Sequence, residues 1–147
     1  MVENQPVNGA ARFDVRTTSD SHFSWLRTRL SLERTLMSWM RTGVALIGFG
    51  FTIFQFFGRL TTTPGVAAPT YPRAPQYLAL ELIGAGTLGL IIAAWEYHTT
   101  NRYLWSTEFK PIAGISGRPE HTPIFAVTIL LILIGIFAFG AVLFRVP

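Results

Sequence analysis

The residues with the clearest chemical potential in this 147-residue chain are arginines that recur along one segment. Arg27, Arg34 and Arg41 stand seven residues apart, which is close to two turns of an α-helix, so the spacing places all three on one helical face. Guanidinium groups bind carboxylates and phosphates through paired N–H donors. The spacing therefore indicates a surface that attracts anions or contacts another subunit.

The same helical face stays polar or small beyond these arginines. Alternating steps of four and three residues define a polar stripe: Arg27, Ser31, Arg34, Ser38, Arg41, Ala45, Gly48, Thr52, Gln55 and Arg59. A bulky apolar line follows the same period on another face: Trp25, Leu32, Trp39, Leu46 and Ile53. Polar groups within a membrane usually face a bundle interior or a water-filled cavity, so we expect the polar stripe to avoid lipid.

Three interpretations of the polar stripe remain open from the sequence. Small residues allow close helix packing while arginines extend to the headgroups. Alternatively, guanidinium groups around an oligomer axis form an anion pathway. In the third interpretation, Arg27, Arg29 and Arg34 bind anionic lipid headgroups.

Two carboxylates near the arginines are candidates for ion pairs. Glu33 stands four residues after Arg29, as a solvated surface pair or as a buried pair that fixes how subunits dock. Glu96, near the end of the second apolar segment, is expected at the level of Arg34 or Arg41, with either as its partner. Glycines allow close helix contact, and we expect this role for Gly43, Gly48, Gly50, Gly86 and Gly89, with Gly48 in a contact between copies.

Catalysis has little support. His98, two residues after Glu96, is expected to be solvated at a helix end, and no histidine has metal-ligand spacing. The chain has no cysteine, and its glycines form no phosphate-binding loop. We expect no enzymatic activity, no cofactor, no metal and no nucleic-acid partner.

Composition and hydropathy define the elements that position these residues. Half of the residues are apolar and 14% are charged, against roughly a quarter in soluble domains, which indicates a membrane protein. Spans of about 20 apolar residues are predicted at 36–58, 76–97 and 123–144. The expected fold is all-α, an integral membrane three-helix bundle over residues 21–147 after a flexible tail at 1–20. Helix-start signals at Ser19-Asp20-Ser21 predict one long first helix to about Arg59, extending into the cytoplasm.

Basic residues predict the orientation in the membrane. Six lie before or at the edge of the first span, two in the first loop, three in the second loop and one in the C-terminal tail. The positive-inside rule then places the N-terminus in the cytoplasm and the C-terminus outside, in a cell inner (plasma) membrane.

The run from Leu32 to Phe51, LERTLMSWMRTGVALIGFGF, resembles the signature of the YidH-like family, domain of unknown function 202. The resemblance implies three spans with a cytoplasmic N-terminus over about residues 22–146. A related domain forms the membrane part of the vacuolar transporter chaperone complex, where basic residues face a polyphosphate channel. By this resemblance, Glu33, Arg34 and Arg41 match motif residues, and Arg102 is the candidate for the basic residue after the second span.

The expected function is therefore an oligomeric channel or translocation subunit for anions or polyphosphate. Its expected partners are membrane lipid, further copies of itself and the anion. The alternative is a non-conducting assembly or accessory protein that scaffolds partners through its small and polar helix faces.

Overall fold

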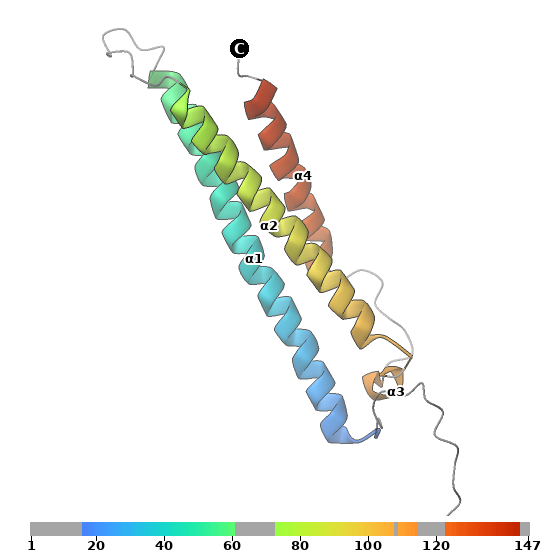
Figure 1. The fold of residues 1–147 in the computed structure, drawn as a ribbon. Coiled ribbons are helices and arrows are strands. Elements are labelled where there is room, and N and C mark those ends of the chain that lie inside the picture. Colours follow the sequence, from blue (N-terminus) through green and yellow to red (C-terminus); the bar gives the residue numbers. More distant parts are fainter. Residues whose placement is uncertain (1–15, 61–72, 108, 115–122, 145–147) are drawn as a thin grey trace, which may run out of the picture.

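The computed structural model describes residues 16–60, 73–107, 109–114 and 123–144, and within these ranges every regular element is a helix (Figure 1). The helices are α1 (Ser19–Leu60), α2 (Ala74–Leu104), α3 (Lys110–Ala113) and α4 (Pro123–Phe144). The all-α prediction is confirmed. Residues 1–15 of the predicted tail and residues 61–72 of the first loop lie outside the described residues.

Local signals explain where the helices begin. Thr18 Oγ1 accepts a hydrogen bond from the Ser21 N–H at 3.2 Å, and Ser21 Oγ accepts one from the Thr18 N–H at 2.9 Å. This reciprocal cap satisfies two backbone donors at the start of α1. The capping residue is thus Thr18, one position before the predicted signal, and Ser19 and Asp20 of the predicted tail form the first helical turn.

The later helices follow their prolines. Pro75 lies in the first turn of α2, and Pro123 opens α4. Backbone N–H groups in the first turn have no partner within the helix, so proline, which lacks this group, loses no hydrogen bond there. α4 covers residues 123–144, as the sequence predicted for the third span. α2 continues beyond Tyr97, where the second span was predicted to end, as far as Leu104.

Three of the helices are long and apolar enough to cross a membrane: α1, α2 and α4. α1 has 42 residues. At about 1.5 Å per residue it is roughly 63 Å long, about twice the ~30 Å hydrocarbon core of a bilayer. Bulky apolar side chains are exposed on the bundle, among them Phe137 at 78% and Trp95 at 74%. Such apolar surfaces are stable in contact with lipid. We conclude that the protein is a multi-pass membrane protein.

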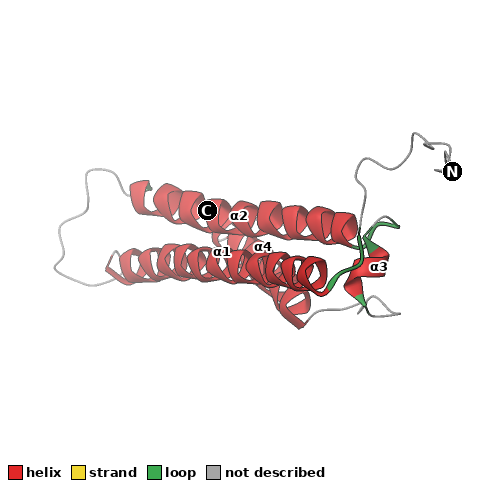
Figure 2. Cartoon of the chain, turned by 90° about the horizontal axis from the view of Figure 1, so that it is seen from below, coloured by secondary structure: helices red, strands yellow, loops and turns green. Residues whose placement is uncertain are grey.

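The long helices lie side by side, with α1 and α4 running in one direction and α2 in the other (Figure 1). α2 makes the most extensive contact with α1, followed by its contact with α4. α3 lies past the end of α2 and beside the first turns of α1 (Figure 1 and Figure 2). The start of α1 and the end of α4 are consequently at opposite ends of the bundle (Figure 1).

Glycines permit the close approach of α1 and α2. A Cβ atom on Gly86 would lie 2.9 Å from the Gly43 carbonyl oxygen, and one on Gly50 would lie 2.9 Å from the Ala79 carbonyl oxygen. Such distances are shorter than side-chain carbon atoms tolerate, so any larger residue would push the helices apart. α4 packs in the same manner, because a Cβ atom on Gly135 would overlap the Thr87 hydroxyl of α2.

Candidate functional site

The polar stripe of α1 lies on the side of the helix that faces away from the rest of the bundle. The buried residues of α1 include Leu36, Gly43 and Gly50. Gly43 follows Arg34 by nine residues, or about two and a half turns, so the two residues are on opposite faces. In the polar stripe only Gln55 is half-buried and the other residues are exposed: Arg27, Ser31, Arg34, Ser38, Arg41, Ala45, Gly48, Thr52 and Arg59.

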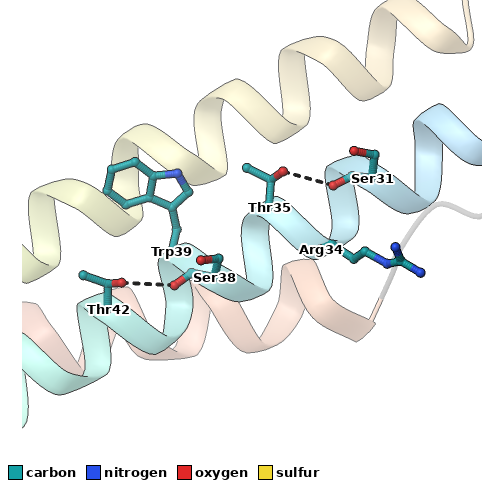
Figure 3. A pocket seen from close by; sticks show the side chains of 6 residues that line it. All are labelled: Ser31, Arg34, Thr35, Ser38, Trp39 and Thr42. Atoms are coloured by element: carbon teal, nitrogen blue, oxygen red, sulfur yellow. Dashed lines mark hydrogen bonds between the residues drawn. The ribbon is translucent and has the colours of Figure 1, made fainter.

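Hydroxyl groups beside the arginines are bonded to their own helix. Thr35 Oγ1 donates to the Ser31 carbonyl oxygen at 3.0 Å, and Thr42 Oγ1 donates to the Ser38 carbonyl oxygen at 3.2 Å (Figure 3). Thr52 makes the same bond to Gly48. These back-bonds satisfy the threonine hydroxyls without a ligand, as is common for threonine in helices.

Two shallow hollows follow this face and share Ser31 and Arg34. The first is lined by Ser31, Arg34, Thr35, Ser38, Trp39 and Thr42. The second is lined by Phe23, Leu26, Arg27, Leu30, Ser31 and Arg34. Arg34 extends from α1 toward its N-terminal part, while Trp39 projects toward α2 (Figure 3). A guanidinium group thus stands where two open, partly polar hollows meet.

Arg29 is held differently from the arginines of the polar stripe. Its Nε lies 3.8 Å from Glu33 Oε1, and the two side chains are only 19% and 20% exposed. Its guanidinium carbon also lies 5.9 Å from the ring centre of Trp25 and 6.0 Å from that of Trp105. Cation–π attraction and the ion pair therefore fix Arg29 in the fold and remove it from the free anion-binding groups.

Hydrogen bonds near the start of α1 join it to the end of α2 and to α3. The Trp25 indole N–H donates to the Leu104 carbonyl oxygen at 3.0 Å in a buried contact. His22 Nδ1 lies 2.7 Å from the Ile112 carbonyl oxygen. Sequence reasoning did not find these contacts, because neither partner carbonyl has a side-chain signal. The two tryptophans, Trp25 and Trp105, were the available clue, and their rings meet edge to face.

Glu96 and Arg102 are both exposed on α2. Glu96 borders a crevice with Leu32, Thr35, Leu36 and Trp39 of α1, so it lies at their level along the bundle. Within the described residues it makes no ion pair with Arg34 or Arg41. Arg102 follows Gly86 by sixteen residues, about four and a half turns, and so lies on the side of α2 away from α1. The fold does not bring Arg102 to the polar stripe.

The five glycines expected to pack have different surroundings. Gly43, Gly50 and Gly86 lie in the contact between α1 and α2. Gly89 is covered by the Trp39 ring, 3.7 Å from where its Cβ would be, and Gly48 has nothing within 4 Å of that position. Gly48 is therefore not part of the packing within one copy. Of the residues that the structure describes, no three His, Asp or Glu side chains gather as a metal site requires.

The fold and this surface define a class of small, multi-pass, all-α membrane proteins with an arginine-bearing face on the first helix. The family model described as domain of unknown function (DUF202) matches residues 24–103, more than half of the chain, and the chain belongs to this family. The sequence-based family assignment is confirmed. No curated protein and no solved structure matches the chain. The matched range contains the polar stripe and Glu96.

Proposed function

We propose that several copies of this protein surround a common axis and that the polar stripe of α1 lines a path for anions across the membrane. One observation carries the proposal. The arginine and hydroxyl face of a membrane-spanning helix lies directly opposite its packing face and is left exposed by α2 and α4. Lipid tails gain little from contact with the guanidinium groups and small side chains of this face.

The arginines nearest to the apolar part of α1 are costly to place in lipid. Placing a guanidinium group at the centre of a span costs about 2.5–3.5 kcal/mol on insertion scales, and less near the interface. Arg41 directly precedes an uncharged run that extends to Gly58. In a closed assembly, water solvates Arg34 and Arg41, and a passing anion or a carboxylate of a neighbouring copy compensates their charge.

The guanidinium N–H donors of the polar stripe indicate the class of substrate. Guanidinium groups in the order Arg27, Arg34 and Arg41 form a ladder of positive charge that suits phosphate-rich anions. Polyphosphate is one candidate, because of the resemblance to the membrane part of the vacuolar transporter chaperone complex. Arg102 has no place in this path, since it lies on the far side of α2. The proposed role is transport without catalysis.

The proposed location is the cell inner membrane, with the N-terminus in the cytoplasm. The excess of arginine before the first span supports this orientation. A reporter that requires the cytoplasm for activity, fused after Pro147, is expected to stay inactive, whereas the same reporter fused before Met1 is active. An active C-terminal fusion would contradict the orientation.

A specific observation favours a second candidate, a non-conducting assembly protein. Thr35, Thr42 and Thr52 direct their hydroxyl groups to their own backbone. Thr52 belongs to the polar stripe, and Thr35 and Thr42 lie beside it, so these three hydroxyl groups need no water when the face packs against another protein helix. In this case the polar stripe joins subunits or partners, and no anion crosses the membrane.

Reconstitution separates the two candidates. Native mass spectrometry in detergent is expected to show a closed oligomer, and liposomes that contain it are expected to release inorganic phosphate or short polyphosphate. The double variant Arg34→Ala, Arg41→Ala should reach the membrane in normal amounts and lose this flux. Arg73→Ala, at the opposite end of the bundle, is the matched control and should keep it. An oligomer without flux supports the assembly role, and a monomer contradicts the anion path.

A further inference from the structure

We propose that Glu96 of one copy forms an ion pair with Arg41 of the neighbouring copy, so that the α1–α2 crevice of each copy is the docking surface for α1 of the next. The inference rests on the self-assembly in the proposed function and names the contact that drives it. It is carried by three observations: the level of Glu96 in the bundle, the side of α2 on which it stands, and the direction of the two side chains.

The level of Glu96 matches that of the arginines. Glu96 lines a crevice together with Thr35, Leu36 and Trp39, which stand between Arg34 and Arg41 on α1. All copies in one bilayer lie at the same depth. Glu96 and Arg41 lie at matching levels on two different faces of one copy. At a contact between copies, the carboxylate of one and the guanidinium of the other are therefore at the same depth.

The two groups face different sides of the same copy. Arg41 follows Arg34 by seven residues and shares its face, opposite the α2 contact at Gly43. Glu96 follows Thr87 by nine residues, so it is on the side of α2 opposite the one that packs on α4 at Gly135. Both side chains are exposed, and in the described part of the chain neither forms an ion pair.

The direction of the side chains selects Arg41 over Arg34. In a helix the Cα–Cβ bond tilts toward the N-terminus. α1 and α2 run in opposite directions (Figure 1), so Glu96 tilts toward the level of Arg41 and Arg41 tilts toward the level of Glu96. Arg34 extends in the opposite direction, toward the first turns of α1 (Figure 3).

The side chains at the rim of this narrow crevice are exposed and available to a second α1. Thr35 and Trp39 lie between the polar stripe and Glu96, so a helix that docks there contacts an indole and a methyl group beside the carboxylate. The contact joins two different surfaces of the two copies, α1 on one and the α1–α2 crevice on the other. Repetition of such a contact closes a ring when the rotation allows it, which is the geometry that an axial path needs.

Disulfide trapping tests the contact directly, because the native chain has no cysteine. Chains carrying Glu96→Cys and chains carrying Arg41→Cys are to be expressed together and oxidised in native membranes. A cross-linked dimer is expected from the mixture. The matched control replaces Glu96→Cys by Trp95→Cys, because Trp95 is 74% exposed and follows Gly86 by nine residues, on the side of α2 away from α1. This control should give a several-fold weaker dimer.

Charge reversal provides the second arm. Glu96→Arg and Arg41→Glu are each expected to diminish the oligomer in native mass spectrometry, and the double reversal in one chain is expected to restore it. Cross-links only between two Arg41→Cys chains would overturn the Glu96 contact while leaving an axial assembly in place. Absence of every cross-link, together with a monomeric native protein, would overturn this inference and the proposed function alike.

Discussion

The outward faces of α1 and α4 differ, although neither is covered by the chain itself. The exposed side of α4 has no charged residue and consists of large apolar side chains such as Leu130, Leu133 and Phe137. The polar stripe on the exposed side of α1 has arginines, hydroxyl groups, Ala45 and Gly48, and exposed apolar side chains such as Val44 and Phe49 lie beside it. Both helices are long and apolar enough to cross a membrane.

Exposure of a side chain in a single copy of a membrane protein therefore has two meanings: contact with lipid, or contact with water or another protein. The face of α4 matches lipid tails, and lipid is a sufficient partner for it. The face of α1 leaves guanidinium groups and small side chains where lipid gains little from contact. Substitutions at matched positions on covered and uncovered faces test whether the two faces meet different surroundings.

The largest effect is expected at the covered glycines. Gly86→Leu places side-chain atoms against the Gly43 carbonyl oxygen, which belongs to a helix backbone and cannot move without separating α1 from α2. We expect destabilisation of about 3 kcal/mol or more, measured as loss of the protein from the membrane and a lower melting temperature. Gly48→Leu, where nothing lies within 4 Å, is the control and should keep the copy folded.

The Gly48→Leu variant also tests the assembly of copies. Gly48→Leu should separate copies in native mass spectrometry if the polar stripe faces an oligomer contact or axis. An unchanged oligomer would remove Gly48 from that contact.

The next effect compares the two outward faces by placing a charge in the middle of the first and the third predicted span. Leu133→Arg puts a guanidinium on the lipid-facing side of α4, at a cost of about 2.5–3.5 kcal/mol on insertion scales. Gly48→Arg adds the same group to the polar stripe, where water or a partner receives it. Membrane abundance should fall for Leu133→Arg and remain near that of the native protein for Gly48→Arg. Equal loss of both variants would show that the two faces meet the same environment.

A smaller effect is expected at the buried indole. Trp25→Phe removes the N–H that donates to the Leu104 carbonyl oxygen and keeps most of the apolar area. The loss of a buried hydrogen bond costs about 1–3 kcal/mol when one partner stays unsatisfied. Thermal unfolding in detergent should report the loss. Trp95→Phe, on an exposed indole, is the control and should leave the melting temperature unchanged.

The smallest effect concerns the pair of Arg29 and Glu33. Glu33→Gln removes one ion pair between neighbouring turns, which contributes about 0.3–0.5 kcal/mol. Arg29→Ala should cost more, since it also removes the contacts with Trp25 and Trp105. If both variants unfold at the same temperature in detergent, the stacking on the two indoles contributes nothing.

Periodicity and hydropathy by themselves determined much of this protein. Long uncharged runs require helices, because backbone groups in lipid find hydrogen-bond partners only within the segment. α4 accordingly agrees with its predicted span, and α1 covers every residue of the polar stripe and of the apolar line. The position of the polar stripe on one side of α1 could also be predicted, because steps of four and three residues keep side chains on one helical face.

The tertiary structure decided which face meets which neighbour. All five glycines, Gly43, Gly48, Gly50, Gly86 and Gly89, were expected to pack, with Gly48 between copies. The crossing of α1 and α2 shows that Gly43, Gly50 and Gly86 are covered within one copy and that Gly48 is open. It also decided that Arg102 stands apart from the polar stripe and that Glu96 borders the α1–α2 crevice. Spacing along one helix fixes relative directions within that helix, whereas the rotation of one helix against another depends on how both surfaces pack.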